Sequence, residues 1–417
     1  MLKKVSIDQL RLGMYVHELC GPWVEHPFWK SRFELSRSSD LQKLRDSSVL
    51  EFWIDLSKGV DVLASPVEAP AAAEPAASED ELAAPMARGA IAPVPMRDEL
   101  GRAAALLRQS RTQVMSMFHE ARMGRALEAE NCLPLVNDIT ESVWRNPGAL
   151  VGLARLKTHD DYSYMHSVAV CALMVALARQ LGQTEAQARE AGLAGLLHDI
   201  GKVMMPLDVL NKPGKLTAAE YDIMRSHPQR GYDLLKGGSS VPEIALDVCL
   251  HHHERPDGRG YPVGLSDPAL SAAARMCAVC DVYDAITSNR PYKEGWDPAE
   301  SVSRMSGWAQ AGQFDTQVFA AFVKSLGVYP VGSLVRMRSG RLAVVVEQGH
   351  GQLLKPQVKV FFSTQSRMPV PIELLDTSNP HCGDIIAARE SNAVWKFKHL
   401  DELWAGREAI AVAKGGQ

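Results

Sequence analysis

Histidines concentrate in one stretch of the chain, and aspartates accompany them. Seven of the thirteen histidines lie between residues 159 and 253, and one of them begins the pair His198-Asp199 in the string LLHDIGK. That pair ends an apolar run, where a buried histidine beside a buried carboxylate is costly unless a partner satisfies both. A divalent metal ion would be such a partner, although an isolated HD pair also has structural explanations.

Further metal-ligating side chains come from other segments, namely His166, His227, the run His251 to His253, and Asp281 in CDVYDAITSNRPYK. Each alone is compatible with a structural role, but together they supply imidazoles and carboxylates from at least four segments. Mixed ligands of this kind suit iron, manganese, zinc or cobalt, and a set without thiolates argues against structural zinc. Five histidines and two aspartates exceed the needs of one catalytic metal. We therefore expect two metals about 3.5–4 Å apart, an arrangement suited to in-line displacement at phosphorus.

The strings HDIGK and HHHERPDGRGYP resemble the HD-GYP family of cyclic di-GMP phosphodiesterases, a branch of the HD metal-hydrolase superfamily. The resemblance covers roughly residues 140–327 and is highly specific, because the HHE-xx-DG-x-GYP string is long. It implies that a metal-bridging hydroxide hydrolyses cyclic di-GMP to linear pGpG, and that a second cut would give GMP. It also implies two divalent ions, iron or alternatively manganese, bridged by Asp199, with the ligands His166, His198, Asp199, His227, His252, His253 and Asp281. His251 lies outside the family pattern, and we do not expect it to be a ligand.

The resemblance also assigns residues around the metals. Lys202 in HDIGK matches the family lysine that contacts the nucleophile and the scissile phosphate, so Lys202 and Asp199 are the expected catalytic residues. Arg290 and Lys293 match phosphate-contacting cations, which a dianionic substrate requires. In the family the GYP loop is associated with substrate access and with docking of partners such as diguanylate-cyclase domain proteins. Its residues here are Asp257, Gly258, Gly260, Tyr261 and Pro262.

One position departs from the family pattern. Some members carry a glutamate four residues before the first histidine, where it supports a third metal, but here that position is Tyr162. A tyrosine is a poor replacement for a carboxylate ligand, so we expect a binuclear site. The departure also bears on whether hydrolysis continues from pGpG to GMP.

Two other functions stay open on sequence grounds. A catalytically silent receptor would bind cyclic di-GMP or a diguanylate-cyclase partner and signal by a conformational change. The complete set of expected ligands favours the enzyme, because degenerate family members lose HD or GYP residues. Alternatively, the same chemistry could act on another cyclic dinucleotide or a nucleotide monophosphate. The GYP string argues against a general HD nucleotidase but does not discriminate among cyclic dinucleotides.

Helices must position these side chains. Apolar residues recur at helical spacing from Arg97 almost to residue 327. The strings Thr184-x-x-Gln187 and Thr217-x-x-Glu220 resemble capping boxes, which predicts helix starts near residues 184 and 217.

Three helix boundaries concern the expected site. Gly201 and Pro206 are expected to mark the end of the helix that carries the HD pair. His166 is expected to precede a buried helix. Pro228 is expected to break a helix, which would aim His227 into a cleft.

The flanking regions have other compositions. Residues 1–63 are predicted to form a small module, with a strand-turn-strand over 5–16, a helix over 40–46 and a strand over 49–54. Residues 64–96 are rich in Ala, Pro and Glu and are predicted to be a semi-extended linker. The strings LRLGMYV, PWVEHPFW and FWIDLSKG look like a domain of unknown function often fused ahead of HD-GYP domains, which implies regulation or partner binding.

Residues 97–327 would then form the helical catalytic domain, and residues 328–417 a β-rich subdomain with strands over 333–337, 341–347 and 357–362. We expect a mainly α fold: a helical HD-type catalytic core, a small α/β N-terminal module and a short β-rich C-terminal subdomain. The long helix from Arg97 would pair with its copy in a homodimer.

Composition limits the class of protein. A net charge of -4 argues against a general nucleic-acid binder, although a few local cations suffice for a small anion. Seven cysteines at irregular spacing indicate a reducing compartment, and Cys277 and Cys280 are expected to be core residues. The longest apolar run is shorter than the roughly 20 residues that a membrane span needs. We therefore expect a soluble, cytoplasmic protein.

Overall fold

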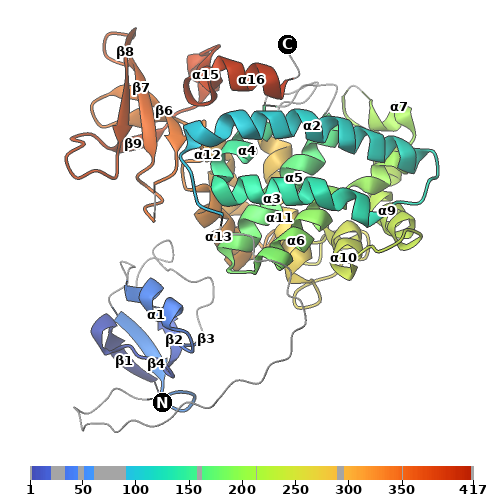
Figure 1. Ribbon diagram of the computed structural model, residues 1–417, viewed down its shortest axis with the longest axis horizontal. Coiled ribbons are helices and arrows are strands. Elements are labelled where there is room, and N and C mark those ends of the chain that lie inside the picture. Colours follow the sequence, from blue (N-terminus) through green and yellow to red (C-terminus); the bar gives the residue numbers. More distant parts are fainter. Residues whose placement is uncertain are drawn as a thin grey trace, which may run out of the picture. The chain divides into compact units, whose positions relative to one another are not determined.

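The computed structural model describes residues 2–19, 33–45, 51–60, 91–156, 162–212, 214–288, 295–349 and 351–414. The chain divides into two units, residues 1–91 and residues 92–417, which are described separately. The expected mainly α fold with β-containing N-terminal and C-terminal regions is confirmed (Figure 1). The predicted linker lies for the most part outside the described residues.

The N-terminal unit is a four-stranded antiparallel sheet in the order β1-β4-β2-β3. Its core is formed by buried aliphatic side chains and Phe52. The predicted helix begins two residues earlier than expected, and the last strand begins two residues later. The elements are β1 (Leu2–Ser6), the 3-10 helix η1 (Ile7–Gln9), β2 (Tyr15–Leu19), β3 (Phe33–Glu34), α1 (Ser38–Arg45) and β4 (Glu51–Asp55).

The second unit is built on helices around α5, in which every residue from Met165 to Ala178 is buried. A helix that is apolar on all sides belongs in the centre of a core. The long helix α2 runs across this body and packs against α3, α4, α5 and the C-terminal α16 (Figure 1). The helices are α2 (Met96–Arg122), α3 (Leu133–Arg145), α4 (Pro147–Ala154), α5 (Tyr162–Gln180), α6 (Glu185–Leu197), α7 (Leu207–Leu210), α8 (Ala218–Arg225), α9 (His227–Lys236), α10 (Glu243–His251), α11 (Ala272–Thr287), α12 (Pro298–Gln310) and α13 (Thr316–Leu326), with 3-10 turns η3 (Ala129–Cys132) and η4 (Ile200–Met204).

Both predicted capping boxes are present. The Thr184 hydroxyl accepts the Gln187 N–H and the Thr217 hydroxyl accepts the Glu220 N–H, each at 3.3 Å. These bonds satisfy N–H groups that lack partners in the first turn of α6 and α8.

Two expected boundaries near the site were wrong. The helix α6 ends at Leu197, before Gly201, and the turn η4 occupies residues 200–204. His166 lies inside α5, because the helix begins at Tyr162. Pro228 does interrupt the helical path, but by starting α9 at its first turn, where its missing N–H costs nothing.

The C-terminal region begins with an antiparallel sheet in the order β8-β7-β6-β5-β9. The three predicted strands are confirmed, and β8 and β9 were not predicted. The expectation of a β-rich tail was incomplete, because the chain ends in helices that return to the main core through Trp404. The elements are β5 (Leu334–Met337), β6 (Arg341–Glu347), β7 (Gln357–Ser363), β8 (Met368–Asp376), β9 (Ile386–Arg389), α14 (Asn392–Trp395), α15 (Leu400–Ala405) and α16 (Arg407–Ala413).

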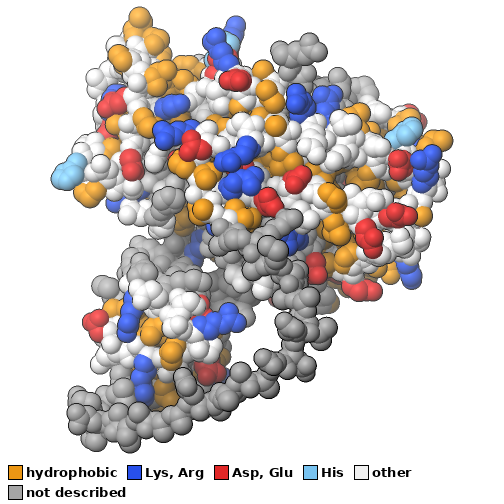
Figure 2. Space-filling model, viewed as in Figure 1, with side chains coloured by type: hydrophobic (Ala, Val, Ile, Leu, Met, Phe, Trp, Pro, Cys, Tyr) orange, Lys and Arg blue, Asp and Glu red, His pale blue; other side chains and the backbone are white. Residues whose placement is uncertain are grey.

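Several expectations from composition can be compared with the structure. Cys277 and Cys280 are fully buried in α11, so their expected core role is confirmed. Among the described residues, no helix combines the length and the apolar character needed to cross a membrane. Figure 2 shows lysine and arginine side chains interspersed with aspartate and glutamate on the visible face, rather than gathered in one basic patch.

Candidate metal centre

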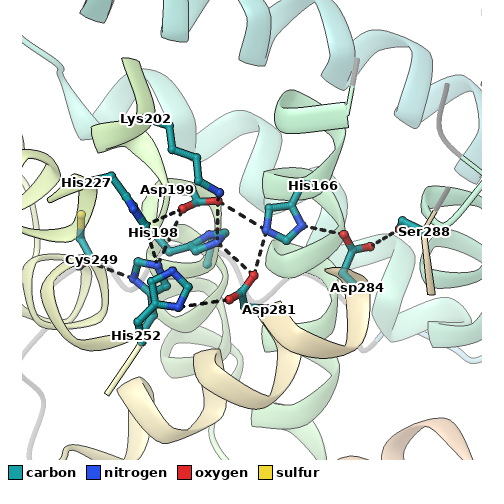
Figure 3. A network of polar contacts seen from close by, with 12 residues as sticks. His166, His198, Asp199, Lys202, His227, Cys249, His252, Asp281, Asp284 and Ser288 are labelled. Atoms are coloured by element: carbon teal, nitrogen blue, oxygen red, sulfur yellow. Dashed lines mark hydrogen bonds and ion pairs between the residues drawn. The ribbon is translucent and has the colours of Figure 1, made fainter. Parts of the chain in front are cut away.

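Seven sequence-predicted side chains converge on one point of the helical unit, and Figure 3 labels all of them except His253. They come from the second turn of α5, the end of α6, the start of α9, the end of α10 and the middle of α11. Asp199 lies at the middle of this group. Its Oδ1 is 3.1 Å from His227 Nε2 and 3.7 Å from His252 Nε2, and its Oδ2 is 3.3 Å from His198 Nε2. His166, His198, Asp199, His227 and His252 are all buried, with 3% or less of their surface exposed.

Backbone carbonyls orient three of the imidazoles. His198 Nδ1 lies 2.8 Å from the carbonyl oxygen of Gly195, and His227 Nδ1 lies 2.7 Å from that of Met224. His252 Nδ1 is 3.0 Å from the carbonyl oxygen of Cys249. A carbonyl can only accept, so each Nδ1 carries the proton and each Nε2 presents a lone pair. All three lone pairs therefore point toward Asp199.

These lone pairs need a cation. His227 Nε2 and His252 Nε2 face each other at 3.3 Å, which places two acceptors in contact. Burial, followed by the neighbouring His253 and His198, holds the pKa of His252 well below its ordinary value, so its ring stays neutral. His198 Nε2 and Asp199 Oδ1 are buried and make no hydrogen bond among the described residues. Buried polar atoms left this way are expensive, and divalent metal ions would satisfy them.

The donor atoms form two groups that share one carboxylate. Asp199 with His227, His252 and His253 offers one set of closely spaced ligand atoms, and Asp199 with His166 and His198 offers the other. Burial raises the pKa of Asp199, but the ammonium charge of Lys202 and contacts with the surrounding imidazoles outweigh this and hold it well below its usual range. An ionised carboxylate between two imidazole groups fits a pair of divalent ions.

Asp281 closes the other side of the centre. Its Oδ1 is 3.0 Å from His166 Nε2, and its Oδ2 is 3.7 Å from His253 Nδ1. Burial raises the pKa of Asp281, but the hydrogen bond and charge of His166 lower it by more than burial raises it. The carboxylate is therefore ionised. It thereby offers one oxygen toward each group of donors.

Asp284 belongs to the site although the sequence reasoning missed it. Its Oδ2 accepts a 2.6 Å hydrogen bond from His166 Nδ1, and its Oδ1 accepts one from the Ser288 hydroxyl at 3.1 Å (Figure 3). A carboxylate that holds the far nitrogen of a ligating histidine fixes its orientation and raises its basicity. The spacing Asp281-x-x-Asp284 could have identified it, because residues three apart lie on one face of a helix.

Gly201 explains how two of the elements approach so closely. A Cβ at this position would lie 1.9 Å from the carbonyl oxygen of His227 and 2.5 Å from the N atom of Gly231. Only glycine lets η4 pack directly against the start of α9. This contact brings His227 beside the His198-Asp199 pair.

The other predicted residues have different surroundings. Lys202 Nζ contacts Asp199 Oδ2 and is therefore at the centre (Figure 3). His251 instead pairs with Asp247 Oδ1 at 2.8 Å, one turn earlier in α10. Arg290 and Lys293 lie outside the described residues, as does the side chain of Tyr162.

The GYP loop folds back onto the histidine segment. The N–H of Tyr261 donates to the His253 carbonyl at 3.3 Å, and the Tyr261 ring lies 4.7 Å from the His253 ring. A Cβ at Gly260 would come within 2.4 Å of Glu254 Cα, so this glycine is required by close contact. Asp257 pairs with Arg255, Gly258 has a positive φ of 73°, and Pro262 is exposed.

Glu254 holds this loop and was also missed. It is buried, with 2% of its surface exposed, and its carboxylate accepts N–H bonds from Val263, Gly264 and Leu265 at 2.7 to 3.1 Å. Three backbone donors converging on one carboxylate form a strong local anchor. The third residue of the HHE string thus connects the histidines to the GYP loop.

Comparisons with known proteins agree with this geometry. A model described as an HD domain matches residues 146–318, and one described as a domain of unknown function (DUF3391) matches residues 2–132. The chain is 52% identical over 407 residues to a cyclic di-GMP phosphodiesterase of Pseudomonas aeruginosa, covering 97% of this chain and 96% of that protein. The chain belongs to the HD-GYP family. The family resemblance drawn from its motifs is therefore confirmed.

Other relatives match this HD-GYP protein over a shorter stretch. The cyclic di-GMP phosphodiesterase response regulator RpfG of Xanthomonas campestris is 38% identical over 48% of this chain and 53% of its own. A 3'3'-cGAMP-specific phosphodiesterase of Vibrio cholerae is 36% identical over 40% of this chain and 39% of its own. Relatives of this HD-GYP protein therefore differ in the cyclic dinucleotide that their names specify.

Proposed function

We propose that this protein is a metal-dependent phosphodiesterase that hydrolyses cyclic di-GMP to linear pGpG. The observation that carries the proposal is the pair of donor groups sharing Asp199, in a member of the HD-GYP family. The name of the relative that is similar over nearly the full length supports the choice of substrate. A second hydrolysis would give GMP.

The proposed ligands divide between two ions. His166, His198 and Asp281 would hold one ion, His227, His252 and His253 the other, and Asp199 both. Iron is the proposed metal and manganese the alternative, because both accept mixed imidazole and carboxylate ligands. When bound, the two ions supply a water of lowered pKa as nucleophile and neutralise charge on the phosphoryl oxygens.

The chain's own groups would position the phosphate. Lys202 lies beside Asp199 and is partly accessible, with 24% of its side chain exposed, so its ammonium can reach a phosphate at the centre. Arg290 and Lys293 are proposed to contact phosphate oxygens on the basis of the family resemblance. The loop of Asp257, Gly258, Gly260, Tyr261 and Pro262 is proposed to border substrate access and to dock diguanylate-cyclase domain proteins.

Hydrolysis of cyclic di-GMP by protein reconstituted without oxygen with Fe(II) or Mn(II) tests the proposal. The wild type and a His198→Ala, Asp199→Ala double variant are compared, with products separated by chromatography. His251→Ala is the matched control, because this neighbouring histidine contacts Asp247 rather than the centre. Turnover by the wild type and control, and none by the double variant, is the expected result. Tight binding without turnover would instead indicate a silent receptor, and turnover of another cyclic dinucleotide alone would change the substrate.

The remaining proposals concern organisation. Residues 1–63 are proposed as a regulatory module, 64–96 as a linker, 97–327 as the catalytic domain and 328–417 as a C-terminal subdomain, in a cytoplasmic protein. The separation of residues 1–91 as a unit supports the first of these. A homodimer through α2 is also proposed, although α2 already packs against four helices of its own chain. Light scattering would test it.

A further inference from the structure

A tyrosine and an arginine of α8 stand next to the GYP tyrosine. The Arg225 guanidinium lies over the Tyr261 ring, 4.8 Å from its centroid, and 6.0 Å from the Tyr221 centroid. Tyr221 is 51% exposed and Arg225 is also exposed. Because the Tyr261 ring packs on the His253 ring, this surface continues directly from the candidate metal centre.

The surface is held in a fixed position. The capping box of Thr217 and Glu220 fixes the start of α8, and Lys212 Nζ pairs with Glu220 at 2.6 Å. At its other end α8 stops at Arg225, two residues before the buried His227. Tyr221 and Arg225 are four residues apart and so lie on one face of the helix.

The Arg225 guanidinium has N–H donors that are available to a ligand. Within the described part of the chain, the Arg225 guanidinium contacts the two tyrosine rings and has no carboxylate partner and no hydrogen-bond acceptor. Arginine carries five N–H donors in a planar fork, and stacking on a ring leaves the edge of the fork available. A planar ligand with two adjacent acceptors would match that edge.

We infer that Tyr221 and Arg225 form a guanine-binding subsite beside the metal centre. The inference rests on the proposed function and deepens it by assigning part of the substrate. Guanine presents O6 and N7 as adjacent acceptors to an arginine fork, whereas adenine presents a donor at N6. The exposed Tyr221 ring supplies a face on which a base stacks. A phosphate would use the charge of Arg225 but not the aromatic surface.

Substrate ratios test the subsite. Each variant is assayed with cyclic di-GMP, with cyclic di-AMP and with bis(p-nitrophenyl) phosphate, an activated diester that has no base. Arg225→Ala and Tyr221→Ala should lower kcat/KM for cyclic di-GMP, relative to that for the base-free diester, by about 10- to 100-fold. Arg225→Ala should also lower the preference for cyclic di-GMP over cyclic di-AMP.

Arg225→Lys separates base recognition from charge. Lysine keeps the charge but lacks the bidentate fork, so the guanine preference should fall as it does in Arg225→Ala. The matched controls are Tyr232→Ala and Lys236→Ala, because Lys236 Nζ lies 5.6 Å over the Tyr232 ring at the same spacing on α9. Both controls should retain the wild-type ratios.

Several results would overturn the subsite. Equal losses for cyclic di-GMP and cyclic di-AMP in Arg225→Ala, with Arg225→Lys restoring both, would mean a phosphate contact instead. Unchanged ratios in both alanine variants would mean no contact. If the metal-reconstituted wild type hydrolyses none of the three compounds, the proposed enzyme fails, and equilibrium binding of the two dinucleotides to the same variants then decides the subsite separately.

Discussion

Replacing Asp284 by asparagine should weaken one of the two metal ions selectively. Asp284 is 3% exposed, and it reaches the centre through the 2.6 Å hydrogen bond that its Oδ2 accepts from His166 Nδ1. Burial lowers the pKa of His166, but hydrogen bonds to Asp281 and Asp284 outweigh this and raise it. Asparagine keeps the shape and an acceptor oxygen but removes the charge.

The size of the effect follows from that lost charge. Hydrogen bonds to ionised acceptors are about twice as strong as neutral ones. Loss of a partner that orients a metal-ligating histidine typically lowers metal affinity about 10- to 100-fold, or about 1.4 to 2.7 kcal/mol. The ion held by His166 and His198 should therefore weaken by this amount. The ion held by His227, His252 and His253 should change little, because Asp284 contacts none of its ligands among the described residues.

Competition with a chelating dye during titration of metal-free protein measures both affinities. Asp384→Asn is the matched control, because this carboxylate is also buried and accepts N–H bonds from Ser339 and Ile385 in the C-terminal region. Thermal unfolding of each metal-free variant separates a folding defect from a binding defect. Two ions bound to Asp284→Asn as tightly as to the wild type would refute the assigned role.

Three further perturbations probe the loop, the close contact and the metals. Glu254→Ala leaves three N–H donors of the GYP loop without their acceptor, so the free energy of local opening should fall by about 1–3 kcal/mol. Amide hydrogen exchange at residues 263–265 measures this opening, and unchanged exchange rates would contradict the prediction. Gly201→Ala should lower the free energy of unfolding in urea by about 1–3 kcal/mol, because the new Cβ clashes with the carbonyl oxygen of His227. Gly307→Ala is the control and should cause no such loss, because a Cβ there meets nothing within 4 Å. Equal effects of the two substitutions would reject the clash. Removing metal with a chelator should lower the melting temperature, because ions at a hundredfold excess over Kd stabilise by about 2.7 kcal/mol, and a chelator-insensitive melting curve would argue against bound ions.

Local sequence patterns predicted much of the fold. The capping boxes at Thr184 and Thr217 set helix starts through short-range hydrogen bonds, which a sequence displays directly. The strand β8 was missed because Pro369 and Pro371 interrupt it, which an edge strand tolerates. The helices α14 to α16 are only four to seven residues long, so they show no periodicity, and packing of Trp404 into the core stabilises them.

The sequence predicts those site residues whose chemistry restricts the residue type. It does not predict those whose role depends on which neighbours the packing of the helices and loops brings into contact. Imidazoles and carboxylates from five helices could be grouped by a family motif, and the structure brings them to one point. Asp284 and Glu254 were missed because their roles depend on which nitrogen or N–H each carboxylate faces. The Arg225 surface depends on the juxtaposition of α8 with the GYP loop, which spacing along the chain does not reveal.

Turnover of cyclic di-GMP as a function of metal added to metal-free protein tests the central claim most directly. The two donor groups sharing Asp199 predict that activity rises until two ions are bound per chain, and that Asp199→Ala gains none at any metal concentration. Full activity with one ion per chain, or undiminished activity in Asp199→Ala, would contradict a catalytic centre built on that shared carboxylate.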